Sequence, residues 1–128
     1  MLKQACTTVA IACLFGCGGS GGGSTTSPPP PGVNTPPPVG GIAVTNNLFT
    51  PASKTVSIGT ALQWAWNTCT DSYTGQTCVA HDIVFDDGVT SGRQDQGTFV
   101  RTFNTAGIYN YHCSIHGATV MSGSVTVQ

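Results

Sequence analysis

The feature that most restricts the fold of this chain is a group of three sulfur and nitrogen side chains near its C-terminal end. Cys113, His116 and Met121 follow the pattern Cys-x2-His-x4-Met. A thiolate, an imidazole and a thioether are soft ligands that select copper, and two His, one Cys and a weak axial Met form the blue-copper arrangement. This stretch supplies one of the two imidazoles, so the fold must bring a second histidine to it.

His81 is the candidate for the second imidazole. It begins the segment 81–85, in which His81, Ile83 and Phe85 share one side of a predicted strand. A histidine on an apolar face is often a packed core residue, but the Cys-x2-His-x4-Met stretch favours a ligand role. The remaining histidine, His112, directly precedes Cys113, and successive strand residues point to opposite faces. His112 is therefore predicted to lie outside the site unless a bulge intervenes.

The apolar pattern of residues 41–128 indicates an all-β domain. Short apolar runs are separated by Gly, Pro and Asn, and no stretch shows helical spacing over a helix length. Short strands separated by such turn residues favour a β-sandwich. Residues 46–51 read as a turn, and the predicted strands cover residues 42–45, 55–58, 61–66, 81–85, 99–103, 107–113 and 123–127.

Residues 41–128 resemble the plastocyanin branch of the cupredoxins. The segments that carry the resemblance are 81–88, 103–109, the Cys113/His116/Met121 stretch and 123–127. The resemblance implies a Greek-key β-sandwich and a monomeric carrier that passes single electrons between transient protein partners. It also implies one copper ion, cycling between Cu(I) and Cu(II), held by His81, Cys113, His116 and Met121.

The resemblance further implies that His116 is the ligand nearest the surface, inside a small apolar ring. The residues that could form the ring are Ile115, Gly117 and Ala118, with Leu48, Phe49 and Pro51 less directly indicated. The chain departs from the family at two places. It has Ile115 where plastocyanins often have Pro, and Asp82 where they often have an Asn that ties the ligand loops together. Whether Asp82 makes that tie is left open by the sequence.

Tyr109 has two possible roles. The Gly-x-Tyr at 107–109 resembles the tyrosine corner of Greek-key sandwiches, in which a Tyr hydroxyl binds nearby backbone. A redox relay is the other reading. Core packing and the corner bond are favoured for Tyr109.

Cys69 and Cys78 bracket a polar segment that resembles an insertion relative to plastocyanin-like chains. If Cys113 binds metal, these two remain as a natural pair within the folded part. A metal-binding or redox-active pair is one interpretation, and a structural disulfide that closes a hairpin is the favoured one. Such a disulfide implies an oxidising compartment outside the cytosol.

The N-terminal residues 1–16 are predicted to be a lipoprotein signal peptide. Lys3 gives a positive head, and the apolar run 5–15 is too short to span a bilayer. The end of the run, Leu-Phe-Gly-Cys at 14–17, resembles the bacterial lipobox, which implies a lipid on Cys17. Cys13 fits that pattern less well. The alternative is an ordinary secretory signal with incidental cysteines.

Residues 17–40 are predicted to form a disordered tether between the lipid and the domain. They are rich in Gly and Ser and then in Pro, and such a segment buries too little surface to offset its ordering entropy. The tether either lets the domain move between partners near a membrane or is a passive stalk. The predicted location is the exported, periplasmic side of the cell envelope.

The charge composition excludes some classes of partner. Charged residues make up 7% of the chain, and the four Lys and Arg form no basic stripe. Nucleic-acid binding therefore lacks its electrostatic footprint. The net charge of −1 also argues against strong electrostatic steering toward any partner.

Several functions remain possible for a copper site of this kind. The leading hypothesis is a tethered blue-copper electron carrier, and the alternative is a copper-binding or delivery module without a redox partner. A vestigial site is a third reading. Zinc is disfavoured because Met is a poor zinc ligand. An enzyme is the weakest reading, because one small domain offers a single closed site.

Overall fold

The computed structural model describes residues 34–128. The predicted signal peptide at 1–16, the lipid site at Cys17 and most of the predicted tether lie outside these described residues. The ten strands are β1 (Ile42–Thr45), β2 (Leu48–Thr50), β3 (Ser53–Val56), β4 (Ala61–Trp66), β5 (Cys69–Ser72), β6 (Gly75–Cys78), β7 (Val84–Phe85), β8 (Thr98–Thr102), β9 (Gly107–His112) and β10 (Ser122–Val127). Among residues 34–128 no helix is long and apolar enough to cross a bilayer.

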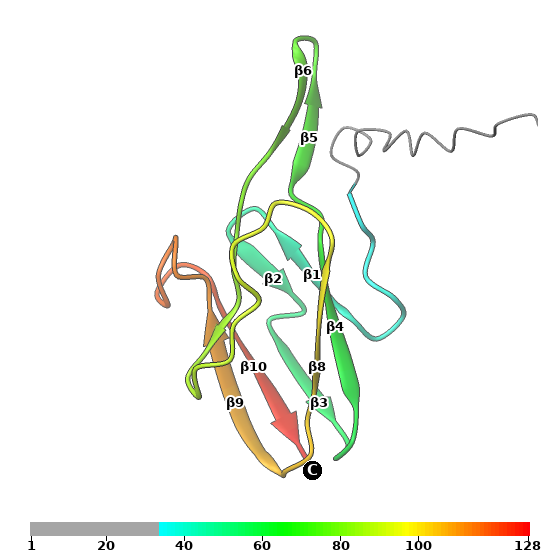
Figure 1. Cartoon of the computed structure of the whole chain (residues 1–128), viewed down its shortest axis with the longest axis vertical. Coiled ribbons are helices and arrows are strands. Elements are labelled where there is room, and N and C mark those ends of the chain that lie inside the picture. Colours follow the sequence, from blue (N-terminus) through cyan, green and yellow to red (C-terminus); the bar gives the residue numbers. More distant parts are fainter. Residues whose placement is uncertain (1–33) are drawn as a thin grey trace, which may run out of the picture.

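Two four-stranded sheets face each other, as the all-β sandwich prediction requires (Figure 1). One sheet has the strand order β2-β1-β4-β8 and the other has the order β3-β10-β9-β7. The period of two places alternate side chains inside the sandwich. In β4, Leu62, Trp64 and Trp66 are buried, and in β10, Val125 and Val127 are buried. The fold-class prediction is confirmed.

Trp64 lies at the centre of the core. Its indole contacts the rings of Phe85 and Tyr111 edge-on, with centroids 5.7 and 5.5 Å away. Phe99 and Phe103 complete its aromatic surroundings. Edge-to-face contacts of this kind stabilise a core beyond the area that they bury. The two sheets are therefore held together by aromatic packing, and this packing includes Tyr111, two residues before Cys113.

The structure differs from the predictions for the segments that form β2 and β3. Residues 46–51 were read as a turn, but β2 (Leu48–Thr50) pairs with β1. The reason is tertiary: Phe49 is buried and packs edge-on against Tyr111 at 4.9 Å, which a short local pattern does not reveal. Strand β3 begins at Ser53 and ends at Val56, ahead of the predicted segment 55–58, because it pairs in parallel with β10.

The β5–β6 hairpin extends beyond the sandwich, at the end where β9 joins β10 (Figure 1). Cys69 and Cys78 face each other at its base and are joined by a disulfide. The residues between them are exposed. A two-stranded hairpin without a buried face is marginal by itself, so the cross-link contributes to holding this one in shape.

Residues 34–40, which the sequence assigned to the tether, contact the domain. The Asn34 side chain donates to the Cys69 carbonyl and accepts from the Cys69 amide, both at 2.9 Å. The Thr35 amide donates to the Trp66 carbonyl, also at 2.9 Å. Asn34 and Thr35, at the end of the predicted tether, therefore bind the ends of β4 and β5 through polar groups and backbone, without burying apolar area.

Tyr109 forms the predicted corner. Its hydroxyl donates to the Thr105 carbonyl at 2.9 Å, and its ring packs edge-on against Phe103 with centroids 4.9 Å apart. The bond fixes the turn that precedes β9. The structural role of Tyr109 is confirmed.

Arg101→Ala is expected to destabilise the protein by about 1–2 kcal/mol, mainly through lost packing. The Arg101 guanidinium lies 4.1 Å from the centroid of Phe85 and about 5 Å from those of Phe103 and Tyr109. It also makes an ion pair with Asp87, which is exposed and so contributes little. Urea denaturation of both variants checks this: Asp87→Asn should lose less than half as much stability as Arg101→Ala, and equal losses would contradict it.

Candidate metal centre

Cys113 and Met121 lie side by side because hydrogen bonds close the loop between β9 and β10. The Cys113 amide donates to the Met121 carbonyl at 3.0 Å, which continues the ladder one step past the strands. The Gly117 amide donates to the Cys113 carbonyl at 2.9 Å, and the Met121 amide donates to the Gly117 carbonyl at 3.0 Å. Gly117 has a φ of 76°, a conformation that glycine adopts without strain. Both Cys113 and Met121 are buried in the core.

His81 reaches the site from the segment just before β7, a neighbour of β9 in the same sheet, and its position is not part of a regular strand. The prediction of a strand over 81–85 was wrong, because only β7 (Val84–Phe85) pairs regularly. His81 instead forms an isolated antiparallel bridge with Gln94, with N–O distances of 2.9 and 3.0 Å. The Trp66 indole N–H also donates to the His81 carbonyl at 3.3 Å. Three hydrogen bonds therefore fix the backbone of His81.

The structure brings three of the predicted ligands to one point. The Cys113 Sγ lies 3.7 Å from the His81 Nδ1 and 3.5 Å from the His116 Nδ1. The three donor atoms all lie within 4.8 Å of one another. The two imidazole rings have centroids 4.8 Å apart. Residues far apart in the sequence thus present one thiol and two ring nitrogens to a common centre.

These separations fit one metal ion between the three atoms. Taking zinc bond lengths as a guide, about 2.0 Å to nitrogen and 2.3 Å to sulfur, two ligands set 110–120° apart lie about 3.5–3.8 Å from each other. The sulfur–nitrogen distances fall in that interval. Met121 adds a buried thioether next to Cys113 in the core. A set of two imidazoles, one thiolate and one thioether is the blue-copper donor set.

The electrostatics of His81 favour the neutral form that a metal ligand needs. Burial, and then the proximity of His116, lower the pKa of His81 below its usual 6.5, while Asp82 acts in the opposite direction to a smaller extent. A neutral imidazole keeps a free lone pair near neutral pH. His81 is therefore ready to bind a cation without first losing a proton.

Asp82 ties the two ligand-bearing segments together. Its Oδ1 accepts the Ser114 amide at 2.6 Å, and its Oδ2 accepts the Ser114 hydroxyl. Burial alone would raise the pKa of Asp82, but the hydrogen bonds from Ser114 outweigh it and hold the pKa below its usual range. The tie that the sequence left open is made, by a carboxylate. Ser114 was not singled out from the sequence, where nothing distinguishes it from other loop serines.

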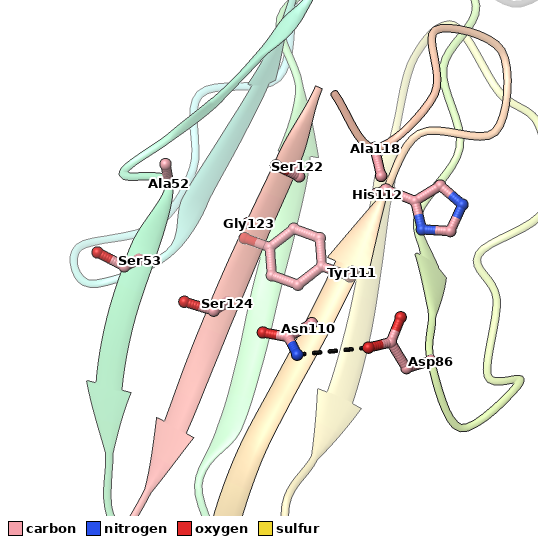
Figure 2. A pocket seen from close by; sticks show the side chains of 10 residues that line it. All are labelled: Ala52, Ser53, Asp86, Asn110, Tyr111, His112, Ala118, Ser122, Gly123 and Ser124. Carbon is pink, nitrogen blue, oxygen red and sulfur yellow. Dashed lines mark hydrogen bonds between the residues drawn. The ribbon is translucent and has the colours of Figure 1, made fainter. Parts of the chain in front are cut away.

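His112 lies on the other face of the sheet, as the alternation of β9 predicts. Figure 2 shows its ring in a surface pocket of about 500 Å³ with Asp86, Asn110 and Ser122. Asn110 donates to Asp86 across this pocket at 3.3 Å. His112 is half-buried there and is separated from the Cys113 sulfur by the sheet itself.

His116 is the one predicted ligand with access to solvent. It is half-buried, whereas His81, Cys113 and Met121 are buried. Ile115 is 39% exposed beside it, and Gly117 and Ala118 are also accessible. Of the less directly indicated ring residues, Leu48 and Pro51 are exposed, but Phe49 belongs to the core. The inclusion of Phe49 in the surface ring was wrong.

Acidification is expected to destabilise the metal-free protein in two separate pH intervals. The unfolded chain binds a proton at His81 near pH 6.5, but the folded chain does so only at a lower pH, so stability falls as the pH drops below about 6.5. Asp82 adds stability that is lost below about pH 3.8, where the unfolded carboxyl is protonated first.

Denaturant titrations from pH 7 to 3 measure both intervals. His81→Asn should remove the first interval and leave the second. A stability that is constant between pH 7 and 5 in the unsubstituted chain would contradict the prediction.

The fold and the donor set together define a copper-binding β-sandwich, and comparison with known proteins agrees. Residues 41–128 match the family described as copper binding proteins, plastocyanin/azurin family. A plastocyanin from Scenedesmus fuscus is 31% identical over 94 residues, which cover 63% of this chain and 87% of that protein. The chain belongs to the plastocyanin/azurin family of copper-binding proteins. Plastocyanin-like members of this family are electron carriers and are generally exported.

Solved structures show the same fold. A purple cupredoxin from Nitrosopumilus maritimus aligns with a TM-score of 0.55 and 22% identity over 68% of this chain and 97% of that chain. A mutant fern plastocyanin aligns with a TM-score of 0.52 and 24% identity over 68% and 98%. The copper-containing nitrite reductase of Thermus scotoductus aligns at 0.54 and 23% identity, but over only 22% of its own length.

Proposed function

We propose that this chain is a type 1 copper protein that carries single electrons between protein partners at the outer side of a membrane. His81, Cys113, His116 and Met121 are its ligands. The observation that carries the proposal is that the three nitrogen and sulfur donors already lie within 4.8 Å of one another. Copper, when bound, supplies the Cu(I)/Cu(II) couple. The protein's part is to hold the ligands so that they move little between the two states.

The structure supports small movement because the backbones of two ligands, His81 and Cys113, are each held by hydrogen bonds from two other residues. The backbone of His81 is held by Gln94 and Trp66, and that of Cys113 by Met121 and Gly117. Asp82 then links the two segments through Ser114. Side chains locked by surrounding hydrogen bonds keep a site close to one geometry, which lowers the reorganisation that each electron transfer requires.

The exposed edge of the site supports electron exchange at His116. This imidazole is the accessible member of the set, and Ile115 and Ala118 beside it give a small apolar surface. A patch of this size suits brief contact with a partner better than permanent assembly. We therefore assign the docking face to the loop between β9 and β10, on a monomer, and we assign no bond-making catalysis to the site.

Redox cycling of the copper-loaded chain tests the proposal against copper delivery. Stopped-flow reduction and reoxidation with small inorganic reagents should be fast and repeatable. A strong Cu(I) chelator should remove little metal over many cycles. A site that gives up Cu(I) within one cycle would overturn the carrier function and favour a delivery module.

The membrane location rests on residues outside the described part of the chain. We propose that export removes residues 1–16 and that Cys17 then carries the lipid, with the following tether joining it to the domain. The Cys69–Cys78 disulfide fits an oxidising compartment. Mass spectrometry of the mature N-terminus is the test, and an unmodified free amine there would overturn the lipid anchor.

A further inference from the structure

Asp82 occupies an unusual position for a carboxylate. It is 7% exposed, and it directly follows His81 in the chain. Both of its oxygens bind Ser114, which directly follows Cys113. One buried side chain is therefore adjacent in sequence to one ligand and hydrogen-bonded to the neighbour of another.

The hydrogen-bond pattern at Asp82 is that of an ionised group. Its oxygens accept from the Ser114 amide and hydroxyl, and an ionised carboxylate is an acceptor only. No cation is paired with it directly: in the part of the chain that the structure describes, the one ion pair joins Arg101 to Asp87. The site therefore has a negative charge beside it, which the hydrogen bonds from Ser114 disperse and which Arg93 offsets only at longer range, without an ion pair.

A negative charge at Asp82 changes the relative stability of the oxidised and reduced states of a metal held by His81 and Cys113. Oxidation adds one positive charge at the centre of the donor set. The attraction between that charge and a nearby anion is strong in a buried setting, because the effective dielectric constant is far below that of water. A fixed negative charge therefore stabilises the oxidised state more than the reduced state.

We propose that Asp82 is a positioning residue that also lowers the reduction potential of the site through its charge. The inference rests on the proposed electron-carrier function. An amide at this position could make the same tie to the Ser114 amide without the charge. The carboxylate thus has two roles, the tie to Ser114 and the negative charge, and a substitution can remove the charge while keeping the tie to the Ser114 amide.

Voltammetry of the copper-loaded full chain separates them. Asp82→Asn keeps an acceptor for the Ser114 amide and removes the charge. It should favour Cu(I) at least tenfold, a rise of about 59 mV for a one-electron couple. The matched control is Asp86→Asn, which removes an equal charge from the outer face of the sheet (Figure 2). Its shift should be less than a third as large, and equal shifts in the two variants would overturn the proposal.

The visible spectrum keeps the two roles of Asp82 apart. An Asp82→Asn variant with an unchanged potential and a displaced visible band would show that the carboxylate only positions the ligands, which also overturns the charge role. If the unsubstituted chain gives no thiolate-to-copper band, the proposed function fails. If the band is present and the potentials of the Asp82 and Asp86 variants agree, this inference alone fails.

Ser114→Ala supplies a second test if Asp82→Asn does not fold. It removes the hydroxyl bond to Asp82 and leaves the amide bond and the charge. A carboxylate with one fewer hydrogen bond has a less dispersed charge, so the potential should fall. A rise in the potential of Ser114→Ala would overturn the proposal.

Discussion

Cys113→Ala is expected to abolish the intense visible absorption of the copper-loaded protein and to weaken Cu(II) binding by more than 100-fold. Cys113 is the only free cysteine among residues 34–128, and its sulfur lies 3.5–3.7 Å from both ring nitrogens. No other thiolate in the described part of the chain can replace it. Loss of an outer hydrogen-bond partner of a ligand already costs about 10–100-fold in affinity, so loss of the ligand itself should cost more.

The control for this prediction is His112→Ala, one residue away. The His112 side chain lies in the pocket on the outer face of the sheet, so its loss should leave the band in place. Circular dichroism and denaturation of both metal-free variants show whether each is folded. A band that persists in folded Cys113→Ala would contradict the thiolate assignment, and a band lost in folded His112→Ala would contradict the assignment of faces.

The part of the site that local sequence predicts is the part built from strand alternation and ligand chemistry. Alternation in β9 places Cys113 inside and His112 outside, and the structure agrees. Cys113, His116 and Met121 lie on one loop, so their proximity can be predicted from their spacing in the sequence. His81 could be predicted as a ligand because the donor set required a second imidazole and the chain has only three histidines.

The part that could not be predicted depends on contacts between segments far apart in sequence. His81, Asp82 and Ile83 are buried in succession, which breaks the period of two. The break arises because Asp82 turns toward Ser114, 32 residues away, while the backbone of His81 is held by Gln94. The order of apolar and polar residues along the chain does not show these distant partners. The alternation in residues 81–85 therefore predicted a regular strand.

Gly123→Ala is expected to destabilise the protein by about 3 kcal/mol or more, the upper end of the range for overpacking. Gly123 pairs with Tyr111 across β9 and β10, and Figure 2 shows the tyrosine ring reaching toward it. A Cβ at Gly123 would overlap the Tyr111 Cζ and would lie 2.7 Å from the Ala52 carbonyl oxygen. The ring has little room to move, because Phe49 and Trp64 pack against it.

A double-mutant cycle shows whether this clash is the cause of the loss. In a Tyr111→Val background, the added methyl group no longer meets the ring, so Gly123→Ala should cost at least 1 kcal/mol less than in the unsubstituted chain. Ser124→Ala, at the next position of β10, should change stability by less than about 0.5 kcal/mol. Equal costs of Gly123→Ala in the two backgrounds would mean that the Ala52 carbonyl, rather than the ring, sets the need for glycine. Either result explains why β10 has no side chain at this position, since the tyrosine that fills the space lies two residues before Cys113 and supports its strand.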